Sequence, residues 1–482
     1  MTLPAPAPVS PAPATVPAPA ESPSPQRRVK RTRTVPGRIR ILVGLAVAAV
    51  LLLFTTVSIA IGHARDGLTS IGHTAGPQVV ATADLYFALS DMDGQIANLL
   101  LTGTDSGLGP GRQAMLDRYD EARSQADRAV LQAADLASDD ATEQTTVRAL
   151  LDGLGRYERL ASRALVLDEQ AGHAAGAPPQ EVLDVYRQAT DLMRLDLLPK
   201  AYNLTLDSGT IVRHSYLAEL SAVQAGRVWV GLTGALAILV LLALQIFLTR
   251  GFRRILNVPL LVATIVVAGL TVAGVVVLQH EGNVLTEAKE DGFNSVLALS
   301  RARAIGNTLH GDESRYLLDP QRADTYEQVY LDKSQAVLYL PGGNLDKYYA
   351  AVDAGVAAFP GKADFLGFYG SEASHITLPG QRDAITKVLG LYRSFQQNDR
   401  QIRRFATSGR QRDAVRQVMG PAFGAYDEAL VDLTALHRKA FDSAVREGDD
   451  ALGGWNVVPP AAALAAILLI LIGVRPRLAE YR

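Results

Sequence analysis

Four long apolar runs divide the chain of 482 residues. They cover residues 41–62, 227–248, 255–278 and 455–474. A helix needs about 20 apolar residues to cross a hydrocarbon core about 30 Å thick, and each run provides roughly that length. The pattern therefore predicts four transmembrane helices, with two long stretches of mixed polarity between them.

The charges beside the apolar runs predict how the chain is oriented. Residues 249–254 form a short turn with three arginines and no acidic residue. Short loops rich in arginine stay on the cytoplasmic side of a membrane. We therefore expect residues 63–226 and 279–454 to form two extracytoplasmic domains of a plasma-membrane protein. Both termini, residues 1–40 and 475–482, would then be cytoplasmic.

The N-terminal tail has its own composition. Residues 1–26 hold nine of the 24 prolines and should be disordered. The arginines and lysine that follow are typical of a cytoplasmic anchor that also contacts anionic membrane lipid headgroups, although Thr32 and Thr34 among them could be kinase substrates. The first apolar run could also be a signal peptide with a cleavage site near Ser58 and Ala60. Its length favours an uncleaved span.

Residues 63–226 have helical periodicity. Leu85, Leu89, Met92, Ile96 and Leu99 are spaced by four and three residues in alternation, which predicts one apolar seam. Similar seams predict a second helix at 112–137, a third through Tyr157, and a fourth that passes Pro199 with a kink. Four helices joined by short loops predict an up-and-down bundle whose first and last helices continue into the membrane.

The second half of the chain repeats this plan. Ala88-Leu89-Ser90 has a counterpart in Ala298-Leu299-Ser300, and Ile96-x-Asn98 has one in Ile305-x-Asn307. Each half reads as span, helical domain, span. The sequence therefore predicts an all-α fold with four transmembrane helices and two helical bundles that arose by tandem duplication.

One segment of the second bundle, residues 341–380, has no counterpart in the first. It is rich in aromatic residues, which enrich the cores of protein interfaces. One interpretation is an extra helix and loop packed on the bundle, and the other is a partner-binding surface. In the second interpretation the anchors would be Tyr348, Tyr349, Phe365, Phe368 and Tyr369.

Little in the sequence favours catalysis. We find no metal-binding histidine pair, no nucleophile motif and no phosphate-binding loop, so we expect no enzyme, no cofactor and no metal. The net charge of -2 gives no reason to expect a nucleic-acid partner. Asp399 and His437 interrupt apolar seams of the second bundle. They are expected to form structural ion pairs, with Arg403, Arg404 or Arg438 available as a partner, rather than a ligand site.

The spans carry no ionisable side chain between their ends, whereas transporters usually place such groups at membrane depth. This favours helices that transmit a signal over helices that transport a solute. Small residues four apart predict faces for close helix packing, within the chain or in a homo-oligomer. They are Gly231, Ala235, Gly269, Ala273, Ala462 and Ala466.

The layout of each half resembles the four-helix-bundle sensing domains of bacterial chemoreceptors and sensor kinases. The whole chain, with two such halves and stretches such as residues 311–319, resembles the actinobacterial GlnX-type four-pass membrane proteins. That resemblance implies a non-enzymatic signal transmitter for nitrogen and amino-acid metabolism. Its implied partners are a glutamate/aspartate-binding lipoprotein outside the membrane and a cytoplasmic serine/threonine kinase. The alternative is an envelope scaffold or a transporter accessory subunit.

Overall fold

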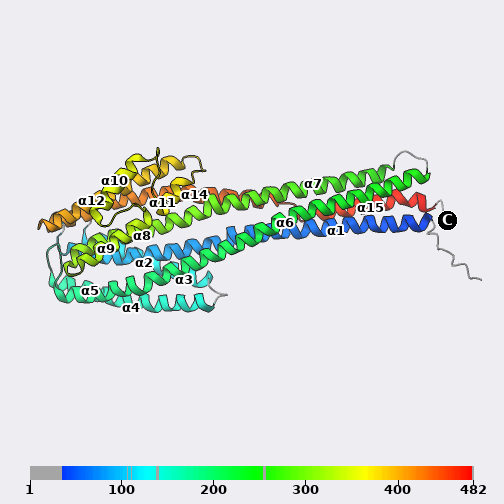
Figure 1. The fold of residues 1–482 in the computed structure, drawn as a ribbon. Coiled ribbons are helices and arrows are strands. Elements are labelled where there is room, and N and C mark those ends of the chain that lie inside the picture. The colour runs from blue at the N-terminus through cyan, green and yellow to red at the C-terminus, as the bar shows by residue number, and fades with distance from the viewer. Residues whose placement is uncertain (1–34, 106, 110, 137–140, 253–256, 480–482) are drawn as a thin grey trace, which may run out of the picture.

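The computed structural model describes residues 35–479, apart from residues 106, 110, 137–140 and 253–256. The tail with Thr32 and Thr34, part of the arginine-bearing turn and residues 480–482 lie outside the described residues. The molecule is a long rod (Figure 1). Long helices lie alongside one another at one end, and the remaining helices gather in a wider head at the other end.

The described part of the chain is helical, and its only β-type pairing is an isolated antiparallel bridge between Tyr339 and Leu366. Segments η1, η2 and η3 are π-helical, and η4 is a 3-10 turn. The elements are α1 Val35–Thr69, η1 Ser70–Ala75, α2 Gly76–Thr102, α3 Arg112–Leu136, α4 Ala141–Ala171, α5 Gln180–Leu192, η2 Met193–Leu197, α6 Leu198–Phe252, α7 Val258–Glu287, η3 Ala288–Phe293, α8 Asn294–Leu318, η4 Pro320–Arg322, α9 Ala323–Val337, α10 Leu345–Ala358, α11 Gly367–Ser374, α12 Gln381–Thr407, α13 Gln411–Val418, α14 Ala422–Ala451 and α15 Val458–Ala479.

Four helical stretches are long and apolar enough to cross a membrane. They are Gly37–Thr102, Gln180–Arg250, Val258–Leu318 and Val458–Pro476. The all-α fold with four membrane-length helices, which the sequence predicts, is therefore confirmed. The first three stretches run from the span into the head without leaving the helical conformation, so a displacement at one end can reach the other along a continuous backbone.

The π-helical segments lie within these long helices. η1 and η3 each lie between a span and the head. In these segments each helical turn contains about one more residue than in an α-helix, and the helix continues on both sides. η2 lies directly before Pro199, where the missing proline N–H removes one helical hydrogen bond. The helix continues past Pro199 as α6, and the kink predicted there stays a prediction.

The head is built around α2 and α8, which lie side by side along its centre (Figure 1). α3 packs against α2, and α9 and α14 pack against α8. The predicted seam residues of α2, Leu85 to Leu99, are buried, and each such side chain contributes about 1.5–3 kcal/mol when fully removed from water. The core around them also includes Leu317, Ile402 and Val418, so apolar packing is continuous across the two halves of the chain.

Asp399 and His437 both form buried ion pairs. Arg403 donates to Asp399 over 2.9 Å, as one of the predicted partners. His437 instead contacts Glu372 of α11 at 2.6 Å, a partner that lies in the inserted segment. Burial opposes a charge on His437, but the hydrogen bond and charge of Glu372 outweigh it and raise the pKa of His437.

Candidate functional site

The backbones of α2 and α8 approach closely because both helices have a glycine at the crossing. A Cβ added to Gly94 would lie 3.9 Å from the Cα of Gly311. Polar side chains connect the helices on either side of this crossing. Asn307 donates to Ser90 Oγ over 3.1 Å, and Ser314 donates to Asn98 Oδ1 over 2.5 Å. The two helices are therefore joined by directional bonds as well as by apolar packing.

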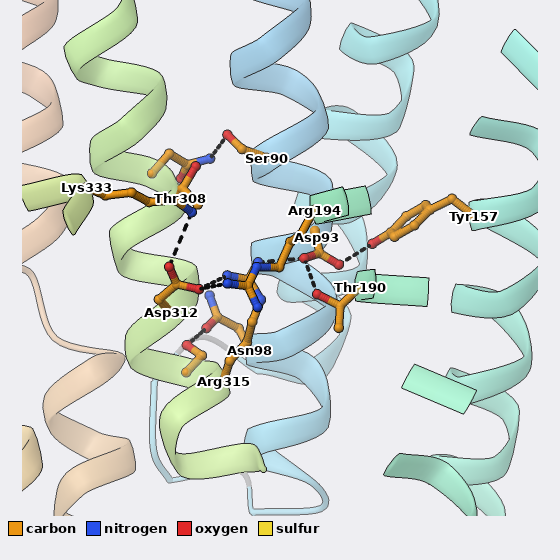
Figure 2. Close-up of polar contacts among 12 residues, drawn as sticks. Ser90, Asp93, Asn98, Tyr157, Thr190, Arg194, Thr308, Asp312, Arg315 and Lys333 are labelled. Atoms are coloured by element: carbon orange, nitrogen blue, oxygen red, sulfur yellow. Dashed lines mark hydrogen bonds and ion pairs between the residues drawn. The ribbon is translucent and has the colours of Figure 1, made fainter. Parts of the chain in front are cut away.

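A buried arginine is at the centre of this contact (Figure 2). Arg315 of α8 is 1% exposed. It donates from Nη2 to Asp93 Oδ2 of α2 and from Nη1 to Asp312 Oδ1 of its own helix, both over 2.6 Å. Asp93 also accepts from Tyr157 OH at 3.1 Å and from Thr190 Oγ1 at 2.8 Å. One carboxylate thus connects α8 with three helices of the first half.

Two further cationic side chains lie near Asp312. Lys333 Nζ lies 3.4 Å from its Oδ2, and Arg194 Nη2 lies 3.8 Å from its Oδ1. Burial alone would raise the pKa of Asp312, but the charges of Lys333, Arg194 and Arg315 lower it to about 2. Burial lowers the pKa of Lys333 to about 8 against the attraction of Asp312. We call Asp93, Arg194, Asp312, Arg315 and Lys333 the central ion network.

Further ion pairs connect α5 with the corner between α8 and α9. Arg187 makes a bidentate contact with Asp319, at 2.6 and 2.8 Å. Arg322 pairs with Asp191 at 2.8 Å. A planar guanidinium paired in this way fixes orientation as well as distance. The two halves are therefore held in register at the far end of the head.

A cavity of about 630 Å³ opens beside the central contact. Its walls come from α2, α3, α8 and the corner between α13 and α14, so both halves of the chain line it. Asn98 and Asn307, which bond across the crossing of α2 and α8, are part of the lining. The central ion network and this cavity together form the candidate functional site.

The aromatic residues predicted as partner anchors lie mainly in the core. Tyr348, Tyr349, Phe365 and Tyr369 are buried, and only Phe368 among the five is partly exposed. Tyr348 OH lies 2.9 Å from Ser334 O, and Tyr349 OH bonds to Asp399. The four buried rings therefore stabilise the second bundle and are not available as surface anchors, contrary to the expectation. A docking role for residues 341–380 stays a prediction that would depend on their exposed positions.

The predicted span-packing residues are also dispersed. Gly231 and Gly269 have nothing within 4 Å of an added Cβ, and Ala235 and Ala273 face outward from the chain. Ala466 is fully buried, and Ala462 is half-buried. Only the α15 pair therefore lies toward a neighbouring helix, and the other four positions are open to lipid or to a second copy.

Other glycines of the long helices make close contacts within the chain. A Cβ added at Gly234 would lie 2.2 Å from Thr271 Cγ2, and one at Gly226 would lie 2.7 Å from Ala60 Cβ. Glycine is required where helix backbones approach this closely. The spacing of small residues alone did not identify which face would be covered, because both faces of these helices carry small side chains.

The central ion network is not among the sites predicted from the sequence. A signal was present, since Asp312 and Arg315 lie in the stretch 311–319 on which the family resemblance rests. Asp93 interrupts the apolar seam of its helix in the same way that Asp399 does. Among the residues that the structure describes, no group of three or more His, Asp or Glu side chains is arranged to hold a metal ion.

Part of the chain matches a known family. Residues 67–217 match a family described as an actinobacterial sensor domain. The matched region extends from the end of α1 into α6 and includes Asp93, Tyr157, Thr190 and Arg194 of the site. Searches of curated proteins and of solved structures gave no match. The match indicates a sensor protein.

Proposed function

We propose that the protein is a transmembrane signal transmitter that converts an event at its head into a rearrangement of its four spans. The observation that carries this proposal is the continuity of three long helices from the head into the spans. The sensor-domain match covers most of the first bundle and supports a receiving role for the head.

The proposed orientation places the head outside the cell and both termini inside. It rests on the arginine-bearing turn and tails, which favour the cytoplasmic side. The resemblance to GlnX-type proteins supports a glutamate/aspartate-binding lipoprotein as the outer partner and a serine/threonine kinase as the inner partner. The lipoprotein would dock on the head when loaded with its ligand, and the kinase would respond to the inner ends of the spans.

The central ion network provides a physical basis for switching. Buried charges are stable only in arrangements that pair them, so α2 and α8 have a small number of allowed positions rather than a continuous range. A partner that binds one arrangement more tightly shifts the balance by its differential affinity, typically about 1–3 kcal/mol. That is below the roughly 5.5 kcal/mol required to move an equilibrium from 1:99 to 99:1, so the response would be graded.

The test is to follow phosphorylation of a kinase substrate in cells while extracellular glutamate or aspartate is added. We expect a change in strains with the protein and none in strains without it. A second test uses a variant with Asp93→Asn and Arg315→Met, which should reach the membrane and lose the response. An identical response in the deletion strain would exclude signalling and favour the alternative, an envelope scaffold or a transporter accessory subunit.

A further inference from the structure

The cavity between the two halves contains a carboxylate that no cation neutralises. Asp91 of α2 lines the cavity and accepts a hydrogen bond from the neutral amide of Gln95 at 3.0 Å. Among the described residues, none forms an ion pair with it within 4.0 Å. Burial raises the pKa of Asp91, and the charge of Asp427 acts in the same direction. Hydrogen bonding to Gln95 and Asn307 and the charge of Arg303 oppose this shift without outweighing it. The cavity therefore has an uncompensated acidic group in its wall.

The other charges that line the cavity do not compensate Asp91. Arg303 makes a bidentate pair with Asp427, at 2.7 and 2.9 Å, and its guanidinium lies 4.0 Å from the ring centre of Phe87. That arginine pairs directly with Asp427, and its charge acts on Asp91 only from beyond ion-pair distance. Arg118 and Glu121 lie exposed on the α3 side of the cavity and have opposite charges.

The remaining basic group of the lining is uncharged at neutral pH. Burial lowers the pKa of His310 to about 4, with the charge of Arg315 acting in the same direction. Its ring stacks on Phe423 with centroids 4.5 Å apart, and its Nδ1 lies 2.9 Å from Glu313. Apart from the paired Arg303 and Asp427, the lining near Asp91 therefore consists of neutral amides and aromatic surface, and Asp91 has no ion-pair partner of its own among the described residues.

We infer that this cavity binds a small organic cation whose primary ammonium group pairs with Asp91. The volume is within the roughly 300–1,000 Å³ typical of small-ligand pockets. The amide oxygens of Gln95 and Asn307 and the ring of Phe423 suit an ammonium on a short carbon chain. Arg118 lies where it could receive a carboxylate on the same ligand, so the ammonium can come from a simple amine or from a zwitterion.

Binding at this place would act on the contact between α2 and α8. Asp91 belongs to α2, Asn307 to α8 and Phe423 to α14, so one ligand would connect three helices and both halves. Asn307 also donates to Ser90 across the crossing. A ligand here would favour the arrangement in which these groups are close. This regulatory consequence depends on the proposed signalling function, whereas the binding itself does not.

The experiment uses the purified full-length protein in nanodiscs and three probes with the same four-carbon chain. Butylammonium has an ammonium only, 4-aminobutyrate has both charges, and butyrate has a carboxylate only. Saturation-transfer NMR and calorimetry should detect the first two and not the third. Asp91→Asn should weaken binding roughly tenfold to a hundredfold, because a charge-assisted hydrogen bond is lost. If the natural ligand is a zwitterion, Arg118→Gln should weaken the binding of 4-aminobutyrate and leave the binding of butylammonium unchanged. If the natural ligand is a simple amine, Arg118→Gln should change the binding of neither probe.

The matched control is Asp120→Asn on the exposed face of α3, which removes the same charge outside the cavity and should leave binding unchanged. The melting temperature of each variant shows that the fold is retained. Binding of butyrate alone, absence of binding by both ammonium probes, or undiminished binding to Asp91→Asn would overturn the inference. Ammonium binding that depends on Asp91 but leaves kinase signalling unchanged would support the site and count against the proposed function.

Discussion

The most direct test of the architecture is to remove the buried arginine at the centre of the head. Replacing Arg315 by methionine keeps most of its length and apolar stem but removes the guanidinium. Asp93 then loses the only cation that pairs with it among the described residues, while Tyr157 and Thr190 continue to donate. Asp312 loses one of three cations and keeps Lys333 and Arg194. The principal cost therefore falls on Asp93.

The magnitude follows from burial. Asp93 and Arg315 are 0% and 1% exposed, so solvent cannot compensate the charge that remains. Breaking a buried pair by removing one partner typically costs about 3–5 kcal/mol. In domains of this size, each 1 kcal/mol lowers the melting temperature by about 2–4 °C. We expect Arg315→Met to lower the melting temperature of the head by about 6–20 °C.

The assay is thermal unfolding of the purified full-length protein, followed by circular dichroism. Arg382→Met, at an exposed position of α12, is the control and should change the melting temperature by less than about 2 °C. The double variant with Asp93→Asn and Arg315→Met should recover much of the loss, because the unpaired charge is gone. A loss below about 1 kcal/mol, or a double variant as unstable as the single one, would refute the buried-pair argument.

Three further predictions concern other parts of the chain. Because the pKa of His437 is raised in the folded protein, its ion pair stabilises the head below a pH of about 6.5, and this stability is lost as the pH rises through the raised pKa. The melting temperature should therefore fall as pH rises through this region, and His437→Gln should remove that dependence. In the spans, Gly234→Val should disturb the contact between α6 and α7 and lower thermal stability, whereas Gly231→Val should be near neutral. For topology, a cysteine placed at Ser371 should react with an impermeant reagent from outside and one at Thr249 should not, and labelling of Thr249 would reject the orientation.

Hydropathy and periodicity were sufficient to predict the helices. The helix predicted at 112–137 is observed as α3 Arg112–Leu136, and the predicted seam of α2 is buried. These features depend on local sequence, because amphipathic spacing fixes which face of a helix is apolar. The tandem duplication stays a prediction.

The relation between the halves could not be predicted in the same way. The seam of α2 was expected to serve one bundle, yet α2 also packs along α8, and Leu317 and Ile402 complete the core of the first half. Apolar spacing shows that a helix face is buried but does not show against which helix. The aromatic residues of the inserted segment show the same limit. Tyr348 and Tyr369 lie in the core, although the composition of the segment was also compatible with an exposed partner-binding surface.

The fourth long helix differs from the other three in a way that bears on transmission. α14 ends at Ala451 and α15 begins at Val458. Gly454 between them has a φ of 80°, a left-handed conformation that glycine adopts readily because it has no Cβ. Arg65 of α1 holds this joint by donating to Leu452 O over 2.9 Å. Three continuous helices transfer a displacement of the head directly, whereas a jointed helix lets α14 follow the head while α15 stays packed in the membrane. A shift of α2 against α8 would then reach the ends of the spans that lie away from the head as a movement of α1, α6 and α7 relative to α15.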